Sequence, residues 1–505
     1  MNSYHSTRNT GKFYSFSRVI LKGLAPDGGL FVPAKFPGIS PSILINLVGK
    51  SYKQVAFFIF RQFAQEFPDA ELSKIISSSY TGNFDSEKIT PVVKLRDNQY
   101  LLELWHGPTA AFKDVALQIK PRLFSQCIKK GKKYLILVAT SGDTGKAALE
   151  GYKNKAGISI VVFYPGGKVS KLQELSMLTA DGKNLAVIAV KGNFDDTQRL
   201  VKDIFADSGF NRKLKKDYKT YLSSANSINW CRIMPQIVYH LYGYLQLVEQ
   251  KAIHFTDPID IVVPTGNGGN ILAAFYAKKM GLPVRRLICA SNANNAVSRF
   301  LQSGIYDVRK KLIKTPSPSI NILLASNIER ILFEITGDSV RTRRWAEDLN
   351  EKGRFAVDKK TKEKLQAIFF SDSVSNGSTL KTIKKIFDKT GYLLDPHTAV
   401  AVAVAEKYMK NKSDSVPMLI SATAHWSKFA GDVYKALIAL PYKTELKFDE
   451  FTLLNKIHSL APDQEIHRSI RDLKNKKIRQ AGQCPVDKAE AENLILTALD
   501  RFRSS

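Results

Sequence analysis

Short runs of β-branched and aliphatic residues alternate with longer stretches of helical pattern along most of the chain. Such runs are typical of buried parallel strands that crossover helices join. Ala147–Lys155 and Asn270–Met280 have the helical pattern. We therefore expect an α/β fold with at least one doubly wound sheet. The predicted strands are Tyr134–Thr140, Ile158–Pro165, Leu185–Val190, Ile259–Gly266, Leu287–Asn292 and Met418–Ala424.

The pattern differs at both ends of the chain. Before about residue 88, Pro41–Phe67 has the apolar spacing of two helices, which follow a glycine-rich turn at Asp27–Leu30. We interpret this part as a separate N-terminal domain. After residue 440, Ile495, Leu499 and Phe502 are spaced i, i+4 and i+7, which predicts one apolar helical stripe.

Composition indicates a globular protein with an unusual charge. Of the 505 residues, 44% are hydrophobic and 24% are charged, which excludes a disordered or fibrous chain. Lys and Arg number 75 against 46 Asp and Glu, a net charge of +29 that invites a nucleic-acid or acidic-membrane interpretation. The basic residues recur throughout the chain, however, and no RNA-binding or helix-turn-helix signature is present. We interpret the charge as a diffuse surface bias that at most steers a small anion.

Cysteine spacing and the apolar runs indicate where the protein resides. The four cysteines are far apart and form no CxxC pair, which argues against a zinc site or a disulfide framework and favours a reducing compartment. No signal peptide is visible, and no apolar run approaches the roughly 18 residues that a spanning helix needs. We expect a cytoplasmic protein that binds no metal, membrane or nucleic acid.

Three predicted strands end in turns rich in glycine or hydroxyl groups, and ligands of α/β sheets bind outside such strand ends. Thr140–Gly145 leads into a helix that we expect to begin at Gly145 or Lys146; it is either an anion site or an ordinary N-cap turn. Pro264–Asn270 holds three glycines whose amides can surround a phosphate, with a flexible turn as the alternative. At Ser421–His425 a hydroxyl can meet a ligand ring, whereas a lone histidine is more often structural.

Lys113 is the candidate nucleophile. It follows Phe112, and Val115 lies just beyond Asp114. An apolar flank can desolvate a lysine, which lowers its pKa and frees the amine to form a Schiff base with a carbonyl group. A surface lysine at a helix start is the alternative. Together with the two anion turns and a late threonine, such a lysine matches the needs of pyridoxal phosphate, an aldehyde that carries a phosphate.

Eleven segments carry a resemblance that runs in order over nearly the whole chain. They are Tyr4–Arg8, Gly23–Pro33, His106–Asp114, Ala139–Gly145, Tyr164–Met177, Gly192–Gln198, Ser223–Gln236, Pro264–Asn270, Ser317–Arg330, Asp395–Val400 and Thr423–Phe429. In these segments the chain resembles threonine synthase, a fold-type II pyridoxal-phosphate enzyme. The resemblance implies a tryptophan synthase β-like core of two doubly wound α/β lobes with the cofactor between them. It also implies an N-terminal domain at 1–88, a core at 89–440 with a smaller lobe at roughly 120–225, and a C-terminal helical segment at 441–505 packed on the core.

The resemblance also implies roles for residues at matching positions. Lys113 resembles the Schiff-base lysine, and Thr423 resembles the hydroxyl partner of the pyridine nitrogen. The other implied cofactor contacts are Asp143, Gly266, Asn267, Gly268, Gly269 and Asn270. The implied substrate contacts are Ser141, Thr144, Ser227, Asn229, Arg232 and Lys168. Among these, Arg232 is the candidate for the substrate phosphate, because a guanidinium matches phosphate oxygens bidentately.

The implied reaction converts O-phospho-L-homoserine and water to L-threonine and phosphate by γ-elimination and β-addition of water, the last step of threonine biosynthesis. Two alternatives stay open: a phospho-lyase that gives a 2-oxo acid, and a basic binding protein without catalysis. Gly268, Asn321, Trp426 and Cys231 depart from the family pattern, which bears on efficiency and substrate fit more than on the reaction class. Relatives of this long type imply a monomer or a homodimer.

Overall fold

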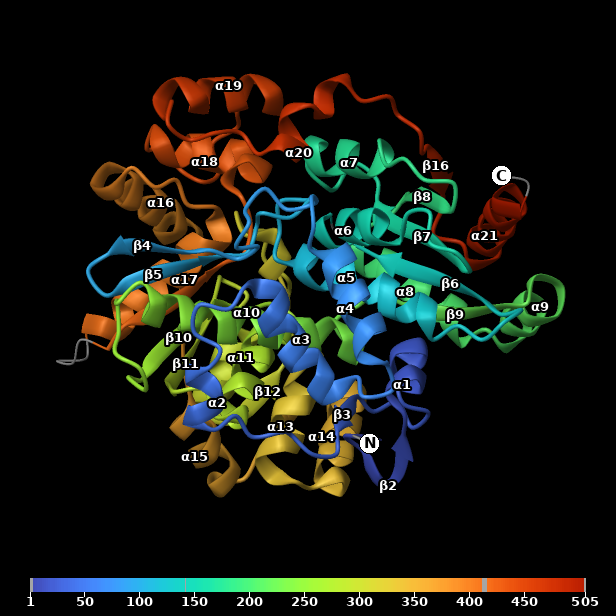
Figure 1. The fold of residues 1–505 in the computed structure, drawn as a ribbon. Coiled ribbons are helices and arrows are strands. Elements are labelled where there is room, and N and C mark those ends of the chain that lie inside the picture. Colours follow the sequence, from blue (N-terminus) through green and yellow to red (C-terminus); the bar gives the residue numbers. More distant parts are fainter. Residues whose placement is uncertain (1–2, 141, 411–415, 504–505) are drawn as a thin grey trace.

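Two open sheets organise the protein, and the computed structural model describes residues 3–140, 142–410 and 416–503 (Figure 1). The larger sheet is parallel except for the antiparallel pairing of β4 with β5, and every pair in the smaller sheet is parallel. The order of the larger sheet is β14 (Phe369–Ser373), β11 (Val284–Ser291), β10 (Ile259–Pro264), β15 (Met418–Ala422), β5 (Gln99–Glu103) and β4 (Val92–Arg96). The order of the smaller sheet is β16 (Gly482–Cys484), β8 (Leu185–Val190), β7 (Ile158–Pro165), β6 (Lys133–Ala139) and β9 (Thr220–Ser224).

Helices cover both faces of each sheet. Side chains alternate between the two faces of a strand, so a strand with apolar residues at successive positions has an apolar surface to bury on each face. In β6, Leu135 and Leu137 pack with one helical layer, whereas Ile136 and Val138 pack with the layer on the other face. The predicted doubly wound fold is therefore confirmed. Helices of the smaller lobe and the link to the larger one are α5 (Lys113–Gln126), α6 (Asp143–Tyr152), α7 (Lys171–Leu178), α8 (Phe194–Ala206), α9 (Ser208–Tyr218) and α10 (Trp230–Glu249). Those of the larger lobe include α11 (Gly269–Met280), α12 (Ala296–Ser303), α16 (Asn376–Thr390) and α17 (Pro396–Lys410).

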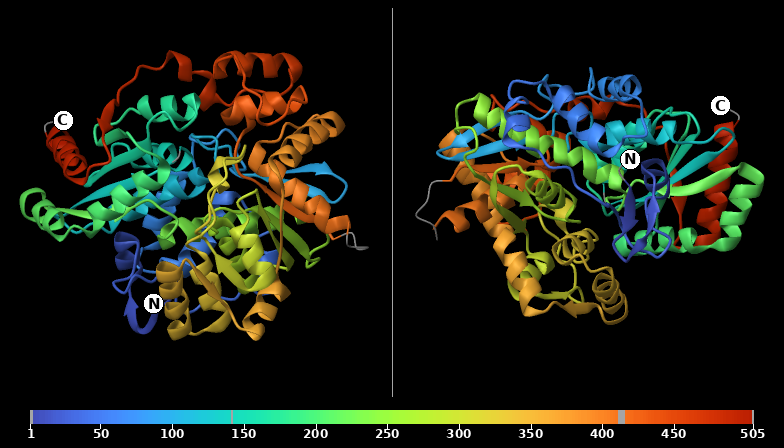
Figure 2. Two further views of the ribbon diagram at one scale, coloured as in Figure 1. Left: turned by 180° about the vertical axis from the view of Figure 1, so that it is seen from behind. Right: turned by 60° about the horizontal axis from the view of Figure 1, so that its bottom comes forward.

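A cap of short elements completes the larger lobe beyond α12. Its strands β12 and β13 form an antiparallel pair, with Tyr306 opposite Phe355 and both side chains buried. Figure 2 shows the helices of this cap grouped on one side of the molecule, away from the smaller sheet. The elements are β12 (Ile305–Asp307), the 3-10 helix η1 (Pro318–Ile320), α13 (Ile328–Thr336), α14 (Ser339–Lys352), β13 (Arg354–Ala356) and α15 (Lys359–Ile368).

The N-terminal elements pack into the same hydrophobic core as the larger lobe. Phe36 stacks on Tyr276 with ring centroids 4.4 Å apart, and Phe63 meets the edge of Trp230 at 5.4 Å. The two helices predicted within Pro41–Phe67 are present as α2 and α3, while the boundary at residue 88 stays a prediction. The elements are β1 (Tyr4–Ser6), β2 (Asn9–Tyr14), α1 (Phe16–Lys22), β3 (Phe31–Pro33), α2 (Pro41–Ile45), α3 (Tyr52–Phe63) and α4 (Asp69–Ser79).

The C-terminal segment runs from the larger lobe to the smaller one (Figure 1). In α21, Ile495 and Leu499 are buried against the smaller sheet, as the apolar stripe predicts. The segment also contains a strand that the sequence did not predict, because β16 pairs with β8 and adds an edge strand to that sheet. The elements are the 3-10 helix η2 (Trp426–Phe429), α18 (Ala430–Leu437), α19 (Glu450–Leu460), α20 (Arg468–Arg471), the 3-10 helix η3 (Leu473–Asn475), β16 and α21 (Lys488–Arg503).

Candidate active site

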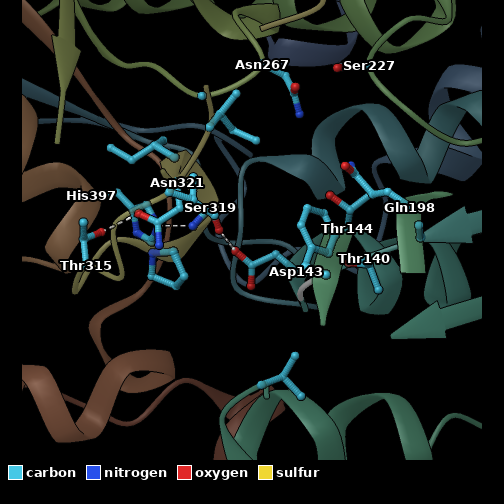
Figure 3. A pocket seen from close by; sticks show the side chains of 18 of the residues that line it. Thr140, Asp143, Thr144, Gln198, Ser227, Asn267, Thr315, Ser319, Asn321 and His397 are labelled. Carbon is cyan, nitrogen blue, oxygen red and sulfur yellow. Dashed lines mark hydrogen bonds between the residues drawn. The ribbon is translucent and has the colours of Figure 1, made fainter. Parts of the chain in front are cut away.

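A cavity of about 2420 Å³ opens at the carboxyl ends of strands from both sheets. Its wall includes Ala139 at the end of β6 and Pro264 at the end of β10, together with Thr423 just beyond β15. Figure 3 shows polar side chains from both lobes pointing into this space. The three turns singled out by the sequence thus meet at one cavity, as expected for α/β sheets.

Lys113 is buried at the first position of α5 and lines the cavity. The backbone N–H of Phe112 donates to the carbonyl of Thr423 at 2.9 Å, and Ala111 pairs with Ala424 as an isolated bridge. These contacts hold the lysine segment against the end of β15. The alternative of a surface lysine is therefore excluded.

Asp143 lies between two lysines from distant parts of the chain. Its Oδ2 accepts from Lys113 Nζ at 3.3 Å, and its Oδ1 pairs with Lys428 Nζ at 2.5 Å. Ser319 Oγ also donates to Oδ2 at 2.7 Å, as Figure 3 shows. Burial alone would raise the pKa of Asp143, but the charges of Lys428 and Lys113 outweigh it and hold the pKa well below its usual value.

Helix α6 begins at Asp143, two to three residues earlier than the sequence predicts. Thr140 Oγ1 accepts from the backbone N–H groups of Gly142 and Gly145 at 3.0 Å each, so a side chain inside the turn satisfies two early donors. Gly142 has a φ of +140°, and a Cβ there would lie 2.7 Å from the Gln173 side chain. Thr144 of the same turn lines the cavity. Ser141, the remaining candidate of this turn, lies outside the described residues.

The glycine-rich turn after β10 leads into α11, which begins at Gly269. All residues from Gly266 to Asn270 line the cavity. A Cβ at Gly266 would lie 2.8 Å from the carbonyl oxygen of Ser319, and Gly268 has a φ of +75°. Asn270 Oδ1 interacts with His240 Nε2 at 2.8 Å, whereas its buried Nδ2 has no hydrogen-bond partner. The N-terminus of a twelve-residue helix beside an unpartnered amide donor is a suitable place for an anion.

Arg232 is a buried guanidinium on the first turn of α10 that also lines the cavity. Its Nη1 donates to the carbonyl of Ala225 at 2.7 Å, while Nε has no partner. No carboxylate of the described residues forms an ion pair with it. Burial lowers its pKa to about 10. A buried cation of this kind calls for an anion in the cavity.

The other predicted substrate contacts divide into two groups. Ser227 and Lys168 line the cavity with Arg232. Asn229 does not: it caps α10, with Oδ1 accepting from Cys231 N at 3.0 Å and Nδ2 donating to Ile20 O at 2.8 Å. Both ends of the Asn229 amide therefore stabilise the fold, and the residue lies outside the cavity lining.

Two buried side chains of the cap region position the anion-binding segments. Asn327 Nδ2 donates to the carbonyls of Asn267 at 3.0 Å and Ser227 at 3.4 Å. Arg330 donates from Nη1 to Asn327 Oδ1 at 2.6 Å and from Nη2 to Ile228 O at 2.6 Å. Together they join the glycine-rich turn to the segment before α10. The sequence placed both residues in a matching segment without assigning them a role.

Sequence reasoning also missed three polar residues around Asp143: Lys428, Ser319 and His397. His397 is 1% exposed; Nε2 accepts from the backbone N–H of Ser319 at 3.0 Å, and Nδ1 lies 2.8 Å from Asp395 Oδ1. The tautomer follows: Nε2 is the acceptor, so Nδ1 carries the proton and donates to Asp395. The matching segments around residues 317, 395 and 423 were the available signal, because each contains one of these polar groups.

The departures from the family pattern are built into the structure in different ways. Asn321 Oδ1 accepts from Thr315 Oγ1 at 2.6 Å and Asn292 Nδ2 at 2.8 Å. Trp426 and Cys231 are both buried in hydrophobic clusters. Gly268 suits its left-handed backbone conformation, which an aromatic residue adopts only with strain.

Comparison with known families first gives the class of protein. The model described as pyridoxal-phosphate dependent enzyme matches residues 84–421. The solved threonine synthase of yeast superposes with a TM-score of 0.88 at 35% identity, covering 99% of each chain. The pyridoxal-phosphate-bound threonine synthase of Brucella melitensis gives 0.86 at 34% identity, covering 100% of each chain. The protein is thus a fold-type II pyridoxal-phosphate enzyme.

The terminal segments and the relatives narrow this class. Models described as threonine synthase N terminus and threonine synthase, C-terminal match residues 3–80 and 398–480. Threonine synthase of Saccharomyces cerevisiae is 40% identical over 86% of this chain and 89% of its own length. Threonine synthase-like 1 of Mus musculus is 43% identical over 95% of this chain, and the chain spans 65% of that protein's length, less than two thirds. The chain belongs to the threonine synthase family, and the prediction from its motifs is confirmed.

The cavity fits the cofactor of this family. Pyridoxal phosphate needs donors for its phosphate, an amine for its aldehyde and a partner for its ring nitrogen. The turn at Gly266–Asn270 with the free Asn270 Nδ2 fits the first need, and buried Lys113 fits the second. Thr423, 6% exposed, lines the same cavity with its hydroxyl available for the third.

Two negative findings hold for the described part of the chain. No group of three or more His, Cys, Asp or Glu side chains there is arranged to hold a metal ion. Among the same residues, every helix is too short or too polar to cross a bilayer.

Proposed function

We propose that the protein is a threonine synthase, which converts O-phospho-L-homoserine and water to L-threonine and phosphate. The observation that carries the proposal is the buried Arg232, which faces the cavity with an unpartnered Nε and has no carboxylate pair among the described residues. A phosphate ester supplies the missing anion and accepts two charge-assisted hydrogen bonds from one guanidinium.

The proposed contacts divide the cavity into three anion subsites. The glycine-rich turn and Asn270 bind the cofactor phosphate at the N-terminus of α11. Arg232, Ser227 and Lys168 bind the substrate phosphate. Thr144, at the N-terminal end of α6, binds the substrate carboxylate together with Ser141 of the same turn. The last two of these subsites suit a substrate that carries both a phosphate and a carboxylate.

The proposed acid–base group is Lys113. The bound cofactor supplies an electron sink for charge that develops on the substrate. Burial lowers the pKa of Lys113, so its Nζ gives up a proton more readily than an exposed lysine does and can then accept one from the substrate. One amine at the base of the cavity can then serve proton transfers at two neighbouring substrate carbons. Thr423, which lines the same cavity, would hold the ring nitrogen of the cofactor through a neutral hydroxyl rather than a charged group.

A second candidate function is a phospho-lyase that releases phosphate and a 2-oxo acid. The comparisons leave it open, because the chain is 43% identical to threonine synthase-like 1 of mouse and 40% identical to threonine synthase of yeast. Both reactions begin with the same substrate and the same proton removal. They differ in where water is added: at Cβ it gives threonine, whereas in place of the amino nitrogen it gives the 2-oxo acid and ammonia.

Product identification tests the proposal. The purified chain is incubated with pyridoxal phosphate and O-phospho-L-homoserine, and threonine, 2-oxobutyrate and phosphate are measured together. Threonine formed in equal amount to phosphate supports the threonine synthase. Phosphate with 2-oxobutyrate and no threonine selects the phospho-lyase, and no phosphate release overturns both.

The cell compartment and the assembly are also proposals. We propose a cytoplasmic enzyme that acts as a monomer or a homodimer without nucleic acid or membrane partners, on the sequence grounds given above. Light scattering of the purified chain measures the assembly, and fluorescence microscopy of the tagged protein reports the compartment.

A further inference from the structure

Lys428 is a second buried lysine in the cavity wall, on the η2 turn after β15. Its Nζ donates to the carbonyl of Thr109 at 2.8 Å and pairs with Asp143 Oδ1 at 2.5 Å. Lys113 pairs more weakly with the same carboxylate, because its Nζ lies 3.3 Å from Asp143 Oδ2. The three side chains therefore carry two ammonium groups and one carboxylate in a buried space.

This charge balance bears on whether Lys113 can act as an amine. A lone Asp143–Lys113 pair would stabilise the ammonium form, which is neither a nucleophile nor a base. Burial lowers the pKa of Lys113; Asp143 raises it, and the charge of Lys428 lowers it again. With one carboxylate for two ammonium groups, the proton is lost from the lysine that is held less tightly. By distance and by number of acceptors, that lysine is Lys113.

The other charged groups around the pair do not change this balance. Arg232 on α10 adds a further positive charge near Lys113. Asp114 on α5 is engaged by Thr109, through N at 2.8 Å and Oγ1 at 2.7 Å, and burial raises its pKa to about 6. Burial holds the pKa of His425, on the Lys428 turn, well below its usual value, so this ring is neutral. His467 of the C-terminal segment pairs with Asp85 at 3.2 Å.

We propose that Lys428 is a positioning residue that takes up the Asp143 carboxylate and so leaves the Lys113 amine uncharged and free to bind the cofactor aldehyde. The proposal deepens the proposed function, since it concerns the same cavity. It depends on Lys113 as the reactive lysine, and it holds for either product of the reaction.

Competitive acetylation of the full-length chain without cofactor tests the proposal. The protein is treated with trace acetic anhydride at a series of pH values, and peptide mass spectrometry gives the pH at which Lys113 is half reactive. Near-ultraviolet circular dichroism confirms that each variant is folded. Lys428→Met removes the charge, Lys428→Arg retains it, and Lys435→Met is the matched control. Lys435 lines the same cavity but bonds to Tyr442 O at 3.0 Å.

The proposal expects Lys428→Met to raise the half-reaction pH of Lys113 by about one to three units, because an opposite charge nearby shifts a pKa by that much. Lys428→Arg and Lys435→Met keep the wild-type value. An unchanged value in folded Lys428→Met overturns the proposal.

A measurement on the wild-type chain covers the case in which Lys428→Met does not fold. In that chain Lys113 takes up acetyl groups at lower pH than Lys428, and the opposite order overturns the proposal. No substrate is used, so the outcome is independent of which product the enzyme makes.

Discussion

Replacing Arg232 by Gln removes the buried guanidinium while keeping a shorter, uncharged hydrogen-bonding side chain. In the structure, Nη1 is committed to Ala225 O, and Nε is buried without a partner. Part of the guanidinium fork therefore remains for a ligand oxygen. Because the wild-type guanidinium is buried without a carboxylate pair, its removal relieves a desolvation cost. That relief offsets the lost bond to Ala225 O, so we expect a change in unfolding free energy within about 2 kcal/mol.

The expected effect on phosphate binding is much larger. A hydrogen bond to a charged group contributes about 1.5–3 kcal/mol, so two of them contribute about 3–6 kcal/mol. Since about 1.4 kcal/mol is tenfold in affinity, Arg232→Gln should weaken phosphate binding by about a hundredfold to ten-thousandfold. Arg232→Lys keeps a positive charge but lacks the planar fork of donors. Its phosphate affinity should therefore lie between those of wild type and Arg232→Gln.

Inhibition by inorganic phosphate is the assay, since phosphate is the proposed product and needs no turnover of its own. The inhibition constant of phosphate and kcat/KM for O-phospho-L-homoserine are measured for wild type, Arg232→Lys and Arg232→Gln. From wild type through Arg232→Lys to Arg232→Gln, the inhibition constant of phosphate should rise and kcat/KM should fall. A phosphate inhibition constant that stays within threefold of wild type in folded Arg232→Gln would refute the assignment of this residue to the phosphate.

Three further predictions use other groups of the site and surface. Lys113→Ala should bind pyridoxal phosphate without the visible absorbance band of a lysine-bound aldehyde, whereas wild type shows that band. Burial lowers the pKa of Lys120 to about 7, where its Nζ donates to Ser224 O at 2.7 Å. Above that pH the unfolded chain binds one more proton at this lysine than the folded chain does. As the pH rises, the free energy of unfolding of wild type should therefore increase relative to that of Lys120→Met, by up to about 1.4 kcal/mol per pH unit. Melting at pH 7, 8 and 9 checks this, and a constant difference contradicts it. The exposed lysines 310, 311 and 314 line the cavity mouth, so kcat/KM should fall with added salt, and less so in the triple Lys→Gln variant.

The strands that sequence predicted are those buried on both faces. Runs such as Ile158–Pro165 match β7 in full, because a strand covered on both faces is mostly apolar along its length. The missed strands include β9 and β14, Thr220–Ser224 and Phe369–Ser373, which contain several serines. They are strands because their backbones form hydrogen bonds with β6 and β11. A prediction based on apolar residues cannot detect such backbone pairing. The three-residue β16 was missed for the same reason.

By itself, the sequence determined the doubly wound architecture and the family, and it singled out the Lys113 segment and the two turns that the structure brings to one cavity. Each of these depends on local chemistry: apolar runs, glycines in turns and the residues next to Lys113. Only the tertiary structure decided that Asp143 lies between Lys113 and Lys428, that Asn229 is a helix cap, and that Arg232 lacks a carboxylate pair. The physical reason is that burial and charge pairing depend on contacts between segments that are distant in the sequence. The spacing of residues along the chain does not reveal those contacts.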